Sequence, residues 1–363
     1  MRSHLSRARG RIIPRLFLLC LFVLVVVLFA AHVTGLPGRF FSARAQEPVP
    51  SSRTEFALNT ICTVTLFDQA NDDVFRDIFS RIREIEDRMS MFLPDSDISR
   101  INAAAGIAPV QVHDDVFMVI ERAVQIAELS GGAFDPTIGP LMDLWGIKGA
   151  NPGVPSQEEI DAVLPLVNWR NIELDRERRT VFLRSPGMEL DLGGIAKGYA
   201  ADETLAIIRA AQLERAIINL GGDAIMHGGR PDGSPWRVGL HTPHAEQRAA
   251  LGIIRGRDMS AVTSGVYEQY FVYNGAHYHH ILSPFDGRPA RTGILSATIV
   301  SFAAAIDADA LSTAIFVLGY ERGRALVDSL EGVEAIFVFE DFSIRITEGV
   351  DFSLTDESFR LLD

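Results

Sequence analysis

The most informative part of this chain is Asp191-Leu192-Gly193-Gly194-Ile195-Ala196-Lys197-Gly198-Tyr199-Ala200-Ala201-Asp202, where an acid, two glycines and a lysine meet at a predicted strand-to-helix junction. Residues 188–192 are expected to form a short buried strand, and apolar residues recur at helical spacing from Ile195 to Ala211. Glycines let the backbone approach a ligand, and the free N–H groups of a first helical turn attract anions. We therefore expect a phosphate site with Lys197 as its point charge. The alternative is a glycine-rich turn with a solvated lysine.

A second block near the C-terminal end supplies oxygen atoms of the kind that bind a hard cation. Residues 306–318 are expected to form a helix that ends at Gly319. Asp309 and Thr313 are four residues apart and share one helical face, with Ser312 beside them. Such donors suit Mg²⁺, which usually keeps water and substrate phosphates as further ligands. Alternatively, Asp307 and Asp309 only complement the helix dipole.

Further segments accompany these two blocks in a fixed order. They are MSMFLPDS at residues 89–96, GGAFDPTIGPL at 131–141 with LWG at 144–146, NLGGD at 219–223, TSGVYE at 263–268, HILSP at 280–284 and GRP at 287–289. Together with the two blocks, and across about residues 55–350, they resemble the ApbE family of FAD:protein FMN transferases. The resemblance implies an enzyme that moves FMN from FAD to a threonine hydroxyl of an acceptor flavoprotein, with Mg²⁺ as cofactor and AMP as leaving group.

The resemblance also implies a role for each matched position. Residues expected to contact FAD are Leu58, Phe92, Ala133, Phe134, Asp135, Asp191, Lys197 and Leu282. Mg²⁺ is expected to be bound by the backbone carbonyl of Gly194 and by Asp309, Ser312 and Thr313. His280 precedes the segment that resembles the flavin-contacting loop, and an imidazole titrates near neutrality, so His280 is the candidate general base.

Four alternatives remain open at this point. A structural or substrate-orienting role would also account for His280. With His277 and His279 it invites a transition-metal site, although His279 and His280 would point to opposite faces of a strand. The same site with water as nucleophile would be an FAD pyrophosphatase. A non-catalytic exported flavin-binding protein would have no need of the metal ligands.

The first 45 residues differ in kind from the rest of the chain. Arg2, Arg7, Arg9, Arg11 and Arg15 precede an uncharged apolar run at residues 16–31, and an Ala-Arg-Ala sequence ends at Ala45. This pattern predicts a signal peptide or a membrane anchor, followed by one catalytic domain at residues 46–363. Arginines on the N-terminal side place the domain outside the cytoplasm, on the periplasmic side of the membrane. The expected acceptor is a membrane redox-complex subunit or a secreted flavoprotein.

Charge and element order complete the expectations. Residues 1–45 contain seven arginines and no acid, so residues 46–363 carry 27 basic against 47 acidic side chains, which excludes nucleic acid as a partner. Cys62 is the only cysteine of that domain and is expected to be a small buried hydrophobe. Strands are predicted at 56–67, 171–174, 180–183, 215–219, 236–240, 252–255, 270–273, 295–300, 335–339 and 343–346, and helices at 74–89, 114–130, 195–211, 306–318 and 320–330. Because strands and helices do not alternate, we expect a mixed α+β domain, and the resemblance implies a T-fold-like core.

Overall fold

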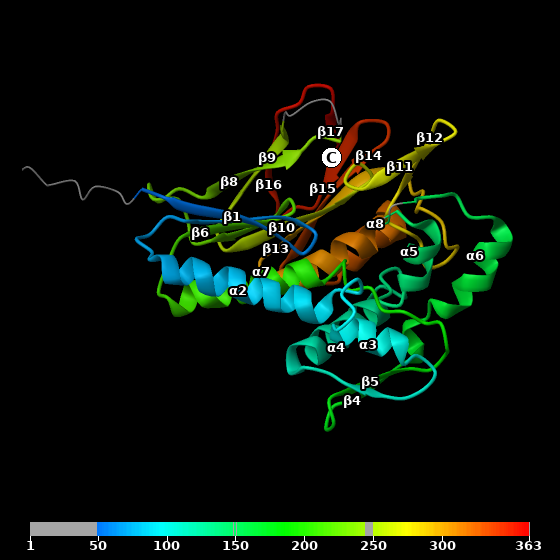
Figure 1. The fold of residues 1–363 in the computed structure, drawn as a ribbon. Helices are drawn as coiled ribbons and strands as arrows, with labels where there is room; N and C mark the ends of the chain where they lie inside the picture. The colour runs from blue at the N-terminus through cyan, green and yellow to red at the C-terminus, as the bar shows by residue number, and fades with distance from the viewer. Residues whose placement is uncertain (1–48, 148, 150, 244–249, 363) are drawn as a thin grey trace, which may run out of the picture. The chain divides into compact units, whose positions relative to one another are not determined.

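The structure, a computed structural model, describes residues 49–147, 149, 151–243 and 250–362. Its main sheet has nine strands, in the spatial order β1 (Ser51–Ala57), β2 (Thr60–Leu66), β6 (Ala216–Leu220), β7 (Asp223–His227), β10 (Met259–Gly265), β13 (Ile294–Ser301), β14 (Val333–Phe339), β15 (Ser343–Ile346) and β17 (Arg360–Leu362) (Figure 1). Neighbouring strands are antiparallel except β15 and β17, which are parallel. The predicted mixed α+β class is confirmed. The predicted signal or anchor segment lies outside the described residues.

Three smaller sheets accompany the main one. They are β16-β9-β8, formed by Asp351–Leu354, Ala250–Gly256 and Trp236–His241; β3-β5-β4, formed by Val110–Gln111, Thr180–Leu183 and Ile172–Asp175; and the hairpin of β11 (Tyr270–Tyr273) and β12 (Ala276–His279). Apolar side chains of β8 and β9 pack with those of β7, β10 and β14 in one core cluster. The β16-β9-β8 sheet therefore covers part of the main sheet.

Seven α-helices lie within the described ranges. They are α2 (Asp72–Met89), α3 (Asp97–Ala103), α4 (Asp114–Leu129), α5 (Gly139–Trp145), α6 (Gln157–Val163), α7 (Ala196–Ala210) and α8 (Ala305–Asp328), and 3₁₀ turns lie at Leu164–Leu166 and Trp169–Asn171. Helices α7 and α8 contact each other and the main sheet, while α2 packs on α7 (Figure 1). Each of these helices is too short or too polar to span a bilayer.

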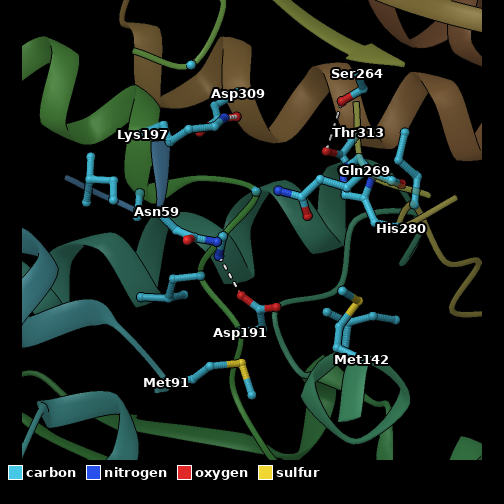
Figure 2. A pocket seen from close by; sticks show the side chains of 18 of the residues that line it. Asn59, Met91, Met142, Asp191, Lys197, Ser264, Gln269, His280, Asp309 and Thr313 are labelled. Atoms are coloured by element: carbon cyan, nitrogen blue, oxygen red, sulfur yellow. Dashed lines mark hydrogen bonds and ion pairs between the residues drawn. The ribbon is translucent and has the colours of Figure 1, made fainter. Parts of the chain in front are cut away.

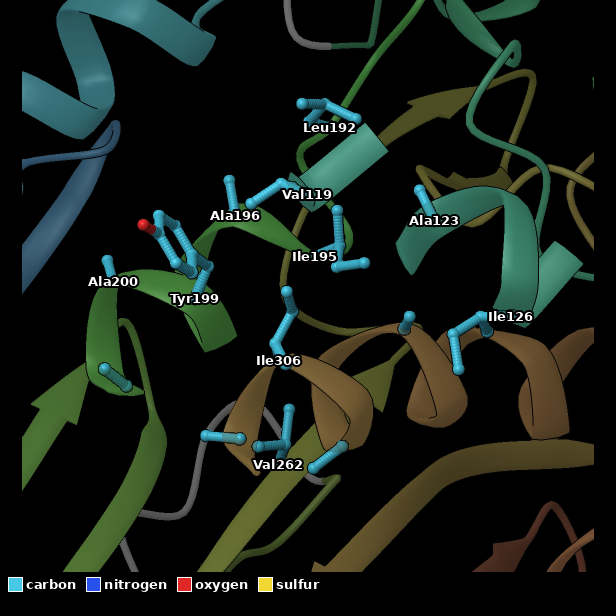
Figure 3. Close-up of a cluster of buried hydrophobic side chains, with 14 of the residues drawn as sticks. Val119, Ala123, Ile126, Leu192, Ile195, Ala196, Tyr199, Ala200, Val262 and Ile306 are labelled. Atoms are coloured by element: carbon cyan, nitrogen blue, oxygen red, sulfur yellow. The ribbon is translucent and has the colours of Figure 1, made fainter. Parts of the chain in front are cut away.

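The largest core cluster joins helices α4, α7 and α8 to the main sheet. Figure 3 shows Val119 of α4 near Ile195 at the start of α7, and Ile126 of α4 beside a later turn of α8. Burial of this apolar surface stabilises the fold and fixes where the two helices begin. The N-termini of α7 and α8, which carry the expected phosphate and metal residues, are therefore held by the core itself.

Two predicted strands differ from the structure. Residues 56–67 form a hairpin, because Leu58 (φ 52°) and Asn59 (φ 55°) make a two-residue turn between β1 and β2. Residues 188–192 form an extended segment with one bridge, between Glu189 and Ile138, and with hydrogen bonds from Leu190 to Asn102 and from Asp191 to Pro136, so they are not a regular strand. The predicted break at Gly319 is present, with a φ of 75° that interrupts α8 as a kink.

A glycine lets α7 and α8 approach each other closely. A Cβ atom at Gly198 would lie 2.3 Å from the carbonyl oxygen of Ala305, well inside van der Waals contact. One turn further along α7, the carboxylate of Asp202 accepts hydrogen bonds from the backbone N–H groups of Ala305 (2.8 Å) and Ile306 (2.9 Å). The start of α8 is thus capped by α7 rather than by its own side chains.

This close approach predicts that Gly198→Ala lowers the free energy of unfolding by about 1–3 kcal/mol, because the added methyl group forces the helices apart. Urea denaturation followed by circular dichroism measures the change. Gly153→Ala is the matched control, because a Cβ atom there would meet no atom within 4 Å. Equal stability of the two variants would contradict the predicted contact.

Candidate functional site

A cavity of about 260 Å³ opens where α7 and α8 begin. It is also lined by residues at the ends of the β1–β2, β6–β7 and β11–β12 hairpins. Figure 2 shows Lys197 and Asp309 near one end of the cavity, with Gln269 and His280 on another wall. Predicted site residues that line it are Leu58, Phe92, Ala133, Phe134, Asp135, Asp191, Gly194, Lys197, His280, Leu282, Asp309 and Thr313. The structure thus brings together in one cavity all but one of the residues selected from the sequence.

Lys197 forms ion pairs with two buried carboxylates. Its Nζ lies 2.7 Å from Oδ2 of Asp223 and 2.9 Å from Oδ1 of Asp309. The resemblance assigned Lys197 to the pyrophosphate, whereas in this structure the ammonium group neutralises acids from β7 and α8. The two acids near the start of α8 have different partners. Asp307 pairs with Arg122 (2.6 Å), whereas Asp309, which is only 3% exposed, pairs with Lys197.

One lysine cannot neutralise all the acids at this end of the cavity. Burial raises the pKa of Asp223 to about 6, with Asp309 adding to the rise and Lys197 opposing it. Burial, together with the charge of Asp223, also raises the pKa of the neighbouring Glu268 to about 8. Like charges in a low-dielectric site disfavour ionisation, and an added cation would relieve this. The cavity end is therefore suited to a positive ion.

Gly194 lies just before Ile195, the N-cap of α7. The N–H of Gly198, one of the first-turn donors that have no acceptor within the helix, donates to Oδ2 of Asp309 (2.9 Å). A Cβ atom at Gly194 would lie 3.3 Å from the Phe134 ring and 3.5 Å from Oγ1 of Thr313. The backbone of Gly194 therefore lies beside Thr313, as the predicted metal site requires.

Hydroxyl groups line the α8 side of the same region. Ser264 Oγ lies 3.3 Å from Thr313 Oγ1 and 2.8 Å from Ser312 Oγ, and Ser312 also donates to the carbonyl of Asp309 (2.8 Å). Thr313 and Ser264 line the cavity, whereas Ser312 is buried behind them. The assignment of Ser312 as a metal ligand stays a prediction, and its observed contacts orient Ser264.

The side chain of Asp135 stabilises the loop that carries it. Its Oδ1 accepts hydrogen bonds from the N–H (2.9 Å) and the hydroxyl (2.6 Å) of Thr137, and its Oδ2 accepts from the N–H of Trp169 (3.1 Å). Burial raises the pKa of Asp135. Ala133 and Phe134 beside it are buried, so this loop presents a rigid apolar surface to the cavity. Its predicted contact with the adenine and ribose side of FAD stays a prediction.

The opposite rim is formed by two turns. Leu58 and Asn59 of the β1–β2 turn line the cavity, and Figure 2 shows Asn59 facing Asp191, whose Oδ1 accepts from the N–H of Gly193 (2.7 Å). A leucine at positive φ is uncommon, and such strain is often found at ligand sites. Phe92, after α2, is 59% exposed and presents an aromatic face that an isoalloxazine ring could stack on.

The three neighbouring histidines have three different surroundings. His277 is exposed and stacks on Tyr270, whereas His279 is buried against Phe316 and His280 lines the cavity. His279 and His280 thus point to opposite sides, as expected of adjacent residues in an extended segment. Nδ1 of His280 lies 3.2 Å from the carbonyl oxygen of Gln269, which can only accept. In the neutral ring this places the proton on Nδ1 and the lone pair on Nε2, the form that a general base needs.

Several residues that line the cavity, or that contact a residue lining it, had no role assigned from the sequence. Asp223, Ser264 and Glu268 lie in the quoted NLGGD and TSGVYE segments. Their position in those motifs was the sequence signal that could have assigned them to the site. Their function depends on partners far away in the sequence, because Asp223 meets Lys197 only through the packing of β7 against α7. Gln269 follows Glu268 and gave no signal of its own.

Comparisons with known proteins identify the family of this chain. The family model of the ApbE family matches residues 58–337. A Treponema pallidum protein named FAD:protein FMN transferase is 35% identical, over 90% of this chain and 93% of its own length. A Klebsiella pneumoniae protein of the same name is 38% identical, over 79% of this chain and 89% of its own.

Solved structures show the same likeness. The crystal structure of the ApbE protein from Thermotoga maritima superposes with a TM-score of 0.77 and 34% identity, covering 83% of this chain and 97% of that protein. The flavin transferase ApbE from Vibrio cholerae gives a TM-score of 0.73 and 27% identity, covering 86% and 98%. The match of the family model over most of the chain, together with these relatives, shows that this chain belongs to the ApbE family.

Proposed function

We propose that this chain is an FAD:protein FMN transferase that depends on Mg²⁺ and moves FMN from FAD to a threonine hydroxyl of an acceptor flavoprotein. The activity is supported by the names of its relatives, which cover most of its length. One structural observation carries the proposal: the cavity joins an acidic, oxygen-rich end at Asp309 and Thr313 to a histidine with a basic Nε2. Such a pairing suits phosphoryl-type transfer, which needs charge neutralisation and an activated hydroxyl.

The residues at the acidic end fit Mg²⁺. Asp309, Thr313 and the Gly194 carbonyl supply hard oxygen donors, and each carboxylate oxygen of Asp309 can accept more than its one observed hydrogen bond. When bound, Mg²⁺ would neutralise charge on the diphosphate of FAD. Without a cation, the acids around Lys197 would repel that diphosphate, because one ammonium group faces several carboxyl groups.

The chain's own residues account for the remaining steps. Phe134 and Leu282 exclude water from one side of the cavity, and Phe92 offers a face to the flavin. His280 Nε2 takes the proton from the acceptor hydroxyl as its oxygen bonds to the FMN-side phosphorus. The bond from that phosphorus to the oxygen of AMP breaks, and AMP leaves with the electron pair. Lys197 holds the side chain of Asp309 in place throughout.

A transfer assay tests this function and its metal. The full chain with FAD, Mg²⁺ and membrane proteins from cells lacking the chain is expected to give a fluorescent, covalently flavinylated band, heavier by one FMN in mass spectrometry, with one AMP released. Asp309→Asn should reduce this transfer about 100-fold or more, because it removes the charge that binds the cation, and EDTA should do the same.

Asp307→Asn is the matched control, since Asp307 lies one half-turn away and pairs with Arg122 outside the cavity. Transfer that survives both EDTA and Asp309→Asn would reject the metal site. Release of FMN and AMP with no labelled protein would instead identify an FAD pyrophosphatase.

The role of His280 predicts a separation of binding from chemistry. His280→Ala should lower kcat about 100-fold or more with little change in FAD affinity, because a general base acts in the transition state. Lys197→Ala should weaken FAD affinity and rate together, since it leaves Asp223 and Asp309 without their counter-charge. Stopped-flow kinetics and flavin fluorescence titration measure the two quantities. Near-normal transfer by His280→Ala across the pH range would show that another group activates the hydroxyl.

We also propose that the catalytic domain works on the periplasmic side of the cytoplasmic membrane, released or anchored by residues 1–45. The arginine-flanked apolar run supports export, and a membrane redox-complex subunit or a secreted flavoprotein is the acceptor that this location would supply. A phosphatase reporter fused after Asp363 should therefore be active in intact cells. A reporter active only in the cytoplasm would overturn this location.

A further inference from the structure

The β11–β12 hairpin connects the cavity to the protein surface. Gln269, just before β11, and His280, just after β12, both line the cavity and meet through the 3.2 Å contact described above. The two strands form a sheet of their own, with no third strand beside them in the described part of the chain. The hairpin therefore begins and ends at the proposed reaction centre (Figures 1 and 2).

The backbone of β11 has one set of groups directed away from its partner strand. The N–H of His280 donates to the carbonyl of Gln269 (3.0 Å), so this cross-strand pair is hydrogen-bonded. Asn274 and Gly275, both at positive φ, form the two-residue turn. Because hydrogen-bonded and non-bonded pairs alternate in antiparallel strands, the N–H and C=O groups of Tyr270 and Val272 point outward.

This outward edge is accessible and held in place. Tyr270 is 41% and Val272 is 55% exposed, whereas the facing end of β12 is buried at His279. On the other face, Phe271 stacks on Tyr278, which packs against Trp145 of α5. One face of the hairpin thus packs on α5, and β12 pairs with one edge of β11. The other edge of β11 has no backbone partner among the residues that the structure describes.

The edge also lacks the charges that usually prevent strands from pairing with other chains. Edge strand β1 carries Arg53 and Glu55, and edge strand β4 carries Glu173 and Asp175. The sequence of β11 is Tyr-Phe-Val-Tyr, with no charged residue. Free strand edges without charge or proline invite the addition of a further strand. The difference among edges of the same protein marks β11 as a strand suited to pairing.

We infer that the outward edge of β11 binds an extended segment of the acceptor protein by strand addition and so delivers its hydroxyl group to the cavity. This inference rests on the proposed function. Strand addition uses main-chain hydrogen bonds for affinity and leaves the side chains to decide specificity. Glu268, which lines the cavity, lies two residues before Tyr270, or roughly 7 Å along an extended chain. A threonine just beyond the paired residues would therefore enter the cavity beside His280.

The test removes the outward N–H without touching the hairpin's own hydrogen bonds. Val272→Pro in the full chain deletes that donor at an edge position where proline is tolerated. With the flavinylated protein identified in the transfer assay as the acceptor, we expect kcat/KM for the acceptor to fall about tenfold or more, while FAD affinity, measured by flavin fluorescence, stays unchanged. Leu361→Pro is the matched control. Leu361 is 45% exposed on edge strand β17. The N–H of the preceding residue, Arg360, donates to the carbonyl of Phe342, so the N–H of Leu361 points away from the neighbouring strand.

Each outcome decides the inference. If Val272→Pro transfers FMN as well as the wild type, strand addition at β11 is wrong. Should that variant also lose FAD affinity, Val272→Lys decides instead, because a charge on the edge opposes pairing without changing the backbone. A wild-type chain that is a dimer in light scattering and becomes a monomer on Val272→Pro would assign the edge to a second copy and overturn the inference. Failure of the wild type to label any protein would refute the proposed function rather than the edge alone.

Discussion

The arrangement of this protein depends on the burial of two carboxylates beside one lysine. Asp223 begins β7, Asp309 lies in the first turns of α8, and Lys197 lies at the start of α7. Buried charges are tolerated only when they are paired and hydrogen-bonded. The ion pairs therefore require the sheet and both helices to meet at one point. That point is the end of the cavity, so the electrostatics of the site and the packing of the fold are one constraint.

The same constraint explains why small residues are needed around the charges. Asp309 reaches the N–H of Gly198 only because α7 and α8 are in close contact, and Gly198 lacks the side chain that would separate them. That hydrogen bond gives a first-turn N–H of α7 an acceptor on α8. A single glycine thus links the packing of the two helices to the position of the Asp309 carboxylate. Loss of the contact would disturb the fold and the proposed metal ligands together.

Sequence patterns predicted the regular elements better than the turns and the partnerships. Helices α2 and α4 and strand β5 follow from apolar periodicity alone, because one face of each is buried. The β1–β2 turn was missed because Leu58-Asn59 lacks the glycine that normally marks such a turn. Family motifs located most of the cavity, but the pairing of Lys197 with Asp223 arises only when residues 26 positions apart meet in the fold. Local propensity contains no information on such a contact.

Adjacent histidines show how the fold separates structure from chemistry within two residues. His279 accepts a hydrogen bond from the N–H of Ile281 (3.3 Å) at Nδ1, so its Nε2 donates to the carbonyl of Ala290 (3.1 Å). Burial lowers the pKa of His279 to about 4, which keeps this ring neutral and its two hydrogen bonds intact near neutral pH. The loop after β12 is therefore fixed whatever the charge of His280. The residue before His280 therefore keeps its hydrogen bonds near neutral pH, and the backbone that carries His280 into the cavity stays in place.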